Sequence, residues 1–264
     1  LLVLTLAATW YAVYYLASSP GAQPVAFAFG GEAKPSDYAR AIADGALLAL
    51  IACLGLAQLS HEATGYLAQL ACTTLIFFAV ATLPYHTVAP AVAVVVGMVG
   101  LTLAGAPALA ALLGAGSIAL VALAQAIPSE RRLRWAVMLA IVTLLAAMLA
   151  WQLDLWRWRL VDAATEGKEF KSLIRLLLWF GWPAWPMAAW TLWRWRKQLF
   201  NRQMHHHLWL PLWFSLVSVG ATFTTQPADR ALLVGLPAIA TLAAFALPTF
   251  RRSMAALIDW FTLL

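Results

Sequence analysis

Three basic residues, Lys168, Lys171 and Arg175, lie at helical spacing immediately before an apolar run of the chain. Positions i, i+3 and i+7 fall on one face of an α-helix, so a helix here would carry a stripe of positive charge. Lys and Arg donate charge-assisted hydrogen bonds to phosphate oxygens, which makes the stripe a candidate substrate-binding site. The alternative is a solvated helix face beside anionic lipid headgroups, partly neutralised by Glu166 and Glu169.

A further basic residue, Arg230, follows Asp229 in a short turn between two apolar runs. An arginine at the edge of a membrane either extends into the polar surface or binds an anion. Asp229 can supply that anion within the chain, and a substrate phosphate can supply it from outside. Arg230 is therefore a second candidate phosphate contact.

A histidine and a carboxylate, His61 and Glu62, are adjacent in the turn after another apolar run. A carboxylate at a membrane–water boundary can serve as a general base or hold an amine. The two residues are candidate catalytic groups, and the alternative is a hydrophilic turn without chemistry.

Three consecutive histidines, His205, His206 and His207, are a weaker candidate for metal binding. Successive helical residues point about 100° apart, so three adjacent imidazoles do not converge on one ion from one face. We expect no metal site and no cofactor.

These residues are set in a chain with the composition of a membrane protein. Hydrophobic residues make up 63% of it and charged residues 11%, against roughly 45–50% and about 25% in soluble domains. Period-two alternation is absent, which argues against an outer-membrane barrel. The net charge of +6 is explained by loop charges that set topology, so we expect no nucleic acid partner.

The apolar runs predict an all-α, polytopic transmembrane helix bundle of about nine spans, forming one domain over residues 1–264. The segment Pro35-Ser36-Asp37 predicts a helix start, with Ser36 as N-cap, that continues through Arg40 and Asp44 into the second span. The expected spans are Leu1–Ala17, Ala46–Leu59, Leu67–Leu83, Ala91–Leu103, Leu109–Ile127, Trp135–Leu153, Leu176–Leu192, Leu208–Thr222 and Leu232–Leu247.

The loop charges predict the orientation of these spans. Alternate loops hold eleven of the 17 Lys and Arg residues, and the other loops hold six. The richer set is expected to face the cytoplasm. The outer set then contains the His61-Glu62 turn, the Asp154–Arg175 loop and the Gln226–Arg230 turn, so the candidate residues share one side of the membrane.

With those residues in view, three stretches resemble bacterial polyprenyl-phosphate-dependent glycosyltransferases of the GT-C superfamily, in the aminoarabinose-transferase and protein-mannosyltransferase-like branch. Leu54–Ala71 is similar to the family's unit of a span, an acidic turn and a span. Glu166–Lys197 resembles its long outer loop leading into a Trp- and Pro-rich helix. Gln226–Phe261 resembles its turn in which a basic residue precedes a Leu- and Pro-rich helix.

The resemblance implies an enzyme of the bacterial inner membrane that acts on the periplasmic face. A sugar on a polyprenyl-phosphate carrier would move to a lipid or protein acceptor, as in lipid A and cell-envelope modification. An acidic residue would act as general base, and Lys168, Lys171 and Arg230 would contact the lipid phosphate. Family members carry their essential acidic residue in a large outer loop after the first span, so we expect that residue, and further spans, upstream of Leu1.

Two other function classes stay open. A transporter or flippase for lipid-linked anions would show broken helices and charges near the middle of the bilayer. The charged residues here cluster in loops, which favours the enzyme. A non-catalytic membrane scaffold is the third class.

Overall fold

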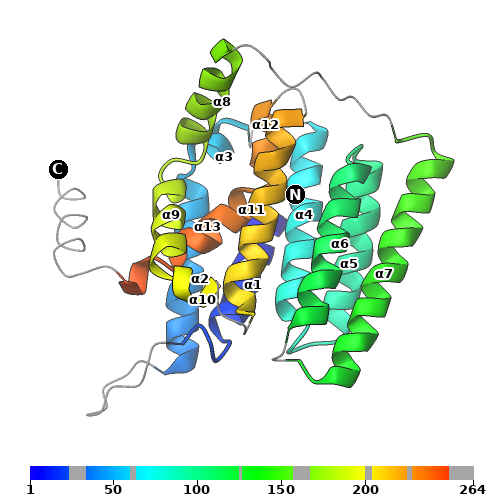
Figure 1. Cartoon of the computed structure of the whole chain (residues 1–264), viewed down its shortest axis with the longest axis horizontal. Helices are drawn as coiled ribbons and strands as arrows, with labels where there is room; N and C mark the ends of the chain where they lie inside the picture. The colour runs from blue at the N-terminus through cyan, green and yellow to red at the C-terminus, as the bar shows by residue number, and fades with distance from the viewer. Residues whose placement is uncertain are drawn as a thin grey trace.

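The computed structural model describes residues 1–23, 34–59, 64–124, 127–156, 167–199, 204–224 and 228–249, with some side chains left out inside the helices. All regular secondary structure in these residues is helical, which confirms the predicted all-α class (Figure 1). The helices are α1 (Leu2–Ala17), α2 (Pro35–Ala52), α3 (Leu54–Leu59), α4 (Gly65–Thr82), α5 (Val88–Leu103), α6 (Pro107–Leu123), α7 (Ser129–Gln152), α8 (Gly167–Phe180), α9 (Ala184–Arg194), α10 (Arg196–Leu199), α11 (His206–Thr224), α12 (Ala228–Leu233) and α13 (Leu236–Ala244), followed by a 3-10 turn, Leu247–Thr249.

Three segments in the described part of the chain are long and apolar enough to cross a membrane: Gly65–Thr82, Ser129–Gln152 and Ala231–Thr249. Three further apolar helices, α1, α5 and α6, have between 10 and 17 residues. These lengths and compositions support membrane association.

Three of the expected spans contain a break. The expected span Ala46–Leu59 divides between α2 and α3, because Cys53 adopts an extended conformation with ψ of 123°. The span Leu176–Leu192 begins in α8, turns at residues 181–183 and continues in α9. The third, Leu232–Leu247, passes from α12 into α13 at Gly235. Gly or Pro lies within the last two breaks, whereas the break at Cys53 contains neither.

The start of α2 differs from the expectation in one respect. The N-cap is Lys34 and not Ser36, and Pro35 occupies the first turn. Proline suits this position because its fixed φ matches the helix and its missing N–H would have no partner there. The expected continuation of the helix through Arg40 and Asp44 is confirmed, since α2 runs to Ala52.

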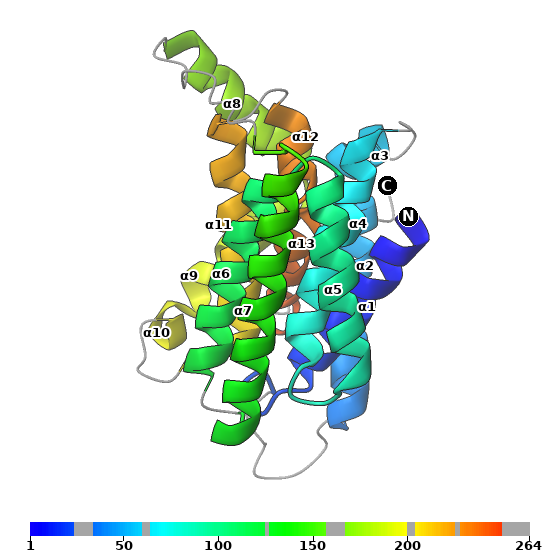
Figure 2. The same cartoon turned by 90° about the vertical axis from the view of Figure 1, so that its right-hand side faces the viewer.

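The buried apolar residues form two clusters. The larger one lies among α1, α2, α4, α5, α6, α7, α11 and α13, and the smaller one among α2, α3, α4, α8, α9, α12 and α13. Helix α13 is enclosed within the bundle, while α7 lies at its edge with most of its surface exposed (Figure 2). The smaller cluster underlies the segments that carry the candidate phosphate contacts.

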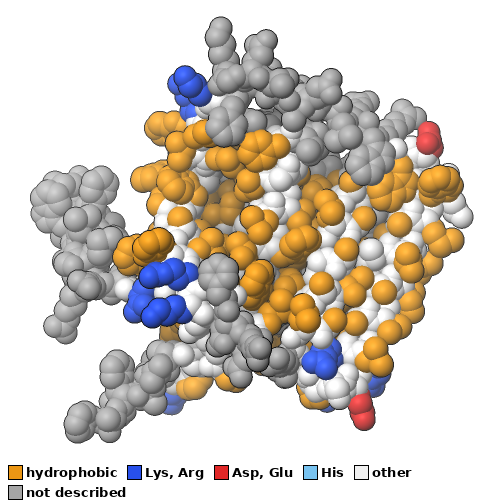
Figure 3. Space-filling model, viewed as in Figure 1, with side chains coloured by type: hydrophobic (Ala, Val, Ile, Leu, Met, Phe, Trp, Pro, Cys, Tyr) orange, Lys and Arg blue, Asp and Glu red, His pale blue; other side chains and the backbone are white. Residues whose placement is uncertain are grey.

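The basic side chains gather at the two ends of the bundle (Figure 3). One group lies on α8 at the top of the view, and others lie around α10 and the start of α7 at the lower ends of their helices. The face over α9 and α11, between these ends, is mainly hydrophobic. Among the described side chains, the cations of α8 thus lie at one end of the bundle and those around α10 and the start of α7 lie toward the other.

Candidate functional site

Helix α8 forms over the segment that carries the cationic stripe, which confirms its helical spacing. Phe180 is buried and Leu176 and Leu177 are partly buried against the smaller core cluster. Lys171 and Arg175 are exposed on the other face. Apolar residues on one face and cations on the other hold the helix against the bundle while its cations remain accessible.

The C-terminal end of α8 has two points of attachment. The indole Nε1 of Trp185 donates a hydrogen bond to the carbonyl of Leu178 at 2.9 Å, which satisfies a carbonyl that the helix end leaves open. The backbone N–H of Leu54 donates to the carbonyl of Trp182 at 3.1 Å. The second bond joins the break between α2 and α3 to the break between α8 and α9.

The contact between α3 and the end of α8 depends on a glycine, Gly55. A Cβ atom built on Gly55 would lie 2.3 Å from Cε1 of Phe180, well inside ordinary van der Waals contact. The backbone of α3 thus lies directly on the ring that ends α8. Any side chain at this position would displace the ring or separate the two helices.

Helix α12, which carries Arg230, packs beside this contact between α3 and α8. The hydroxyl of Ser218 on α11 donates to the carbonyl of Ala231 at 2.9 Å, and both groups are buried. Leu232 and Leu233 are buried in the same cluster as Phe180. Helices α3, α8 and α12 contact one another pairwise and meet at one end of the bundle (Figures 1 and 2).

The candidate residues can now be placed on these elements. Lys168 lies in the first turn of α8 and Arg230 lies on α12, but the side chains of both fall outside the described residues. His61 and Glu62 also fall outside them, in residues 60–63 that follow α3. The fold brings α8 and α12 together with α3, the helix that precedes residues 60–63 in the chain.

Neither exposed cation has a partner among the described side chains. Lys171 and Arg175 make no ion pair there, and the ion pair that the described residues do form, Arg40 with Asp37 at 3.7 Å, lies on α2. Among the described side chains, therefore, neither cation is held in an ion pair that an incoming anionic group would have to break.

An apolar groove of about 270 Å³ begins beside this end of α8. Leu178 of α8 lines its rim and lies one helical turn from Arg175. The walls include Ala189 of α9 and Ser215 of α11, and the floor includes Ile239 of α13. Along its length the groove presents almost only apolar surface.

The groove wall is fixed by contacts of α9 with α13 and with the 3-10 turn that follows it. The buried hydroxyl of Thr191 donates to the carbonyl of Leu242 at 2.7 Å, and Trp190 Nε1 donates to Thr249 Oγ1 at 3.0 Å. On the opposite wall, the buried Ser215 Oγ has no hydrogen-bond partner among the described residues. The groove was not expected from the sequence, because its lining residues come from five separate helices.

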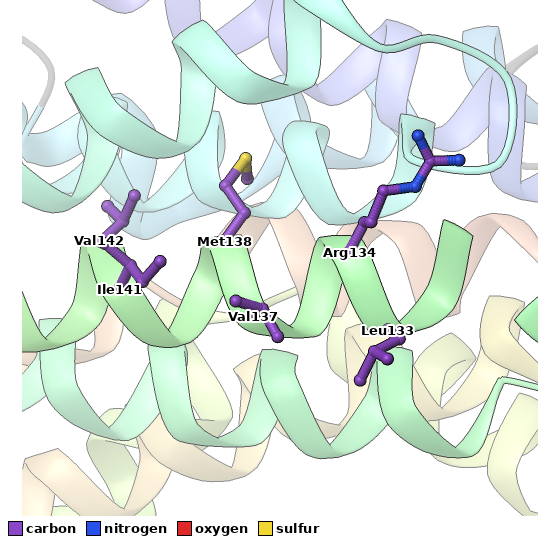
Figure 4. Close-up of a pocket in the computed structure, with 6 residues that line it drawn as sticks. All are labelled: Leu133, Arg134, Val137, Met138, Ile141 and Val142. Atoms are coloured by element: carbon purple, nitrogen blue, oxygen red, sulfur yellow. The ribbon is translucent and has the colours of Figure 1, made fainter. Parts of the chain in front are cut away.

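A second hollow, of about 400 Å³, lies along α7 (Figure 4). Its lining residues, Leu133, Arg134, Val137, Met138, Ile141 and Val142, all belong to that one helix. It contains none of the candidate residues and lies at the edge of the bundle, so it is an uncovered helix face and not a built site.

The rings of His205 and His207 contact each other, with centroids 5.7 Å apart. A ring nitrogen of His206 lies 3.2 Å from the carbonyl of Val80, while His207 is buried against Trp195 and Phe245. Among the residues that the structure describes, no group of three or more His, Cys, Asp or Glu side chains is placed to hold a metal ion.

No protein-family model, curated protein or solved structure matches this chain in the comparisons with known proteins.

Proposed function

We propose that this protein is a bacterial inner-membrane glycosyltransferase that moves a sugar from a polyprenyl-phosphate carrier to a lipid or protein acceptor on the periplasmic face. The observation that carries the proposal is the apolar groove that begins one helical turn from Arg175. An isoprenoid chain is apolar throughout and ends in a phosphate, so an apolar groove with cations at one end complements both parts.

The membrane arrangement follows from pairing the broken helices. We infer that α2 with α3, α8 with α9, and α12 with α13 each cross once, and that α1, α4, α5, α6, α7 and α11 cross singly. This gives the nine crossings expected from the sequence. The Lys and Arg side chains at opposite ends of the fold support this orientation, with the α8 end periplasmic (Figure 3).

In the proposed reaction, the acceptor hydroxyl loses its proton to a carboxylate. Glu62, beside His61, is the candidate for this general base in the chain. The acceptor oxygen forms a bond to the anomeric carbon, and the bond from that carbon to the phosphate oxygen breaks. The electron pair stays on the departing polyprenyl phosphate, whose charge Lys168, Lys171, Arg175 and Arg230 stabilise.

The test is a sugar-transfer assay with the full-length protein in liposomes that contain a polyprenyl-phosphate-linked sugar. Arg175→Ala should lower kcat/KM for the donor about tenfold, since it removes one charge-assisted contact. Arg194→Ala, a cation at the end of α9 away from α8, is the matched control and should leave transfer unchanged. Equal rates of sugar transfer by the wild type and Arg175→Ala would show that Arg175 does not contact the donor.

A transporter or flippase for lipid-linked anions is the second candidate, and one observation favours it. The helix breaks at Cys53 and residues 181–183 lie against each other, joined by the Leu54–Trp182 hydrogen bond. Adjacent broken helices are a feature of transporter binding sites. Movement of the lipid-linked sugar across the liposome bilayer, without release of polyprenyl phosphate, would select the transporter over the enzyme.

A further inference from the structure

Rings from three helices meet at the end of the apolar groove that lies away from α8 (Figure 1). The walls of the groove belong mainly to α9 and α11, and its floor belongs to α13. The ring of Trp195, the residue after α9, contacts the ring of His207 in the first turn of α11, with centroids 5.4 Å apart. His207 in turn contacts Phe245, the residue after α13, at 5.4 Å. These ring contacts join both walls and the floor at one end of the groove.

Packing holds this ring cluster in place. His207 is 1% exposed and Phe245 is fully buried. Trp195 and Phe245 each follow a lining residue of the groove, Leu192 and Leu242, by three positions. At a rise of about 1.5 Å per residue, the rings lie about 5 Å beyond the lining. A chain that enters the groove beside α8 therefore meets the rings at its far end.

The distance from the cations to the rings limits what the groove can hold. Its walls are lined from residues 212–219 of α11 and residues 185–192 of α9, so each wall is about 10 Å long at about 1.5 Å per residue. An extended carbon chain advances about 1.25 Å per bond, so one isoprene unit, with four bonds along the chain, covers about 5 Å. The walls thus hold about two units, and about one more spans the helical turn between Arg175 and the rim at Leu178.

The side of the groove is open where its end is closed. Leu178 at the rim is 43% exposed, and Leu216 on the α11 wall is 56% exposed. The face over α9 and α11 is mainly hydrophobic (Figure 3). A chain longer than the groove can therefore leave through this side and enter the lipid.

We propose that Trp195, His207 and Phe245 limit the groove to the first three isoprene units of the carrier, counted from the phosphate, and that the remaining units lie in the bilayer. The inference rests on the proposed polyprenyl-phosphate carrier and names the part of it that the protein recognises. Lipid tails are as apolar as the leucine side chains of the groove, so units beyond the third add little affinity.

Position-specific photo-crosslinking tests this limit on the full-length wild-type protein in phosphatidylcholine liposomes. Two long polyprenyl phosphates are compared, one with a diazirine on the third isoprene unit and one with a diazirine on the fifth. The third-unit probe should label lining residues such as Leu192 and Leu212, and the fifth-unit probe should label them at least tenfold less. Equal labelling of these residues by both probes, or no labelling of them by the third-unit probe, would overturn the proposal.

A variant tests the role of the rings. In Trp195→Ala a fourth unit can fill the space that the indole leaves, so the ratio of geranylgeranyl phosphate affinity to farnesyl phosphate affinity should rise about fivefold over the wild type. Partitioning of each ligand into the liposomes is the same for both proteins and cancels in this comparison. Trp193→Ala, which removes a ring that is 64% exposed, is the control and should keep the wild-type ratio. An unchanged ratio in a folded Trp195→Ala would overturn the role of the rings, and the wild-type probes test the limit without any variant.

Two further outcomes separate this inference from its alternatives. Displacement of the third-unit probe by phosphatidylglycerol as effectively as by geranylgeranyl phosphate would overturn the isoprenoid occupant in favour of an ordinary phospholipid chain. The predicted labelling by a protein that transfers no sugar would support the length limit and refute the enzyme. Sugar transfer with equal labelling by both probes would do the reverse.

Discussion

The close contact between α3 and α8 predicts that Gly55→Ala destabilises the protein. The new Cβ would lie 2.3 Å from the ring of Phe180, whereas ordinary contacts begin at 3.4 Å. The ring is buried, so either it moves by about 1 Å or α3 separates from α8. Overpacking of this kind costs about 1–3 kcal/mol, partly offset by the ~0.5–1 kcal/mol that Ala gains over Gly within a helix.

The assay is thermal unfolding of the purified protein in detergent, followed by intrinsic Trp fluorescence. Gly55→Ala should lower the apparent Tm by a few degrees, about 2–4 °C for each kcal/mol in a chain of this size. Gly220→Ala is the matched control, because a Cβ at Gly220 meets nothing within 4 Å, and it should leave the Tm unchanged or raise it.

A double variant identifies the ring as the cause. Phe180→Leu alone should destabilise by about 1–2 kcal/mol, since it removes buried volume. In Gly55→Ala/Phe180→Leu the two losses should not add, because the smaller side chain makes room for the methyl group. Full additivity, or a Tm for Gly55→Ala as high as that of the Gly220 control, would refute the contact between α3 and α8.

Three further changes test the groove and its surroundings. Ala189→Trp should fill the groove and raise the KM for the donor about tenfold or more. The control Ala115→Trp, at an exposed position of α6, should leave this KM unchanged. Both values come from the rate of sugar transfer measured at increasing donor concentration. Ser218→Ala should destabilise by about 1–3 kcal/mol in the same unfolding assay, because it leaves the buried carbonyl of Ala231 without its hydrogen bond. Ser215→Ala on the same helix removes a hydroxyl that has no hydrogen-bond partner among the described residues, so it should be neutral or slightly stabilising. A loss of stability as large as that of Ser218→Ala would show that Ser215 does have a hydrogen-bond partner.

The class of the fold and most helix positions were predictable from the sequence. Long apolar runs can only be helices or buried strands, and their lengths favour helices. The spacing of Lys168, Lys171 and Arg175 gave their helix correctly, because one stripe of charge requires a 3.6-residue period. Hydrophobicity alone does not report helix continuity, so the break at Cys53 was missed.

The surroundings of the candidate residues were less predictable. The groove is lined by residues of α8, α9, α11, α12 and α13, and only tertiary packing brings those faces together. Close packing of Gly55 on Phe180 likewise joins positions 125 residues apart, which no local pattern reveals. For His61 and Glu62 the catalytic role stays a prediction, since both lie outside the described residues.

The most direct test of the central claim is photo-crosslinking of the full-length protein with a polyprenyl phosphate that carries a diazirine on its isoprenoid chain. The account predicts crosslinks concentrated on α9 and α11, competed by unlabelled polyprenyl phosphate and weakened by Lys171→Ala/Arg175→Ala. Crosslinks spread along the exposed face of α7 would contradict it. So would crosslinks on α9 and α11 whose yield is unchanged in Lys171→Ala/Arg175→Ala.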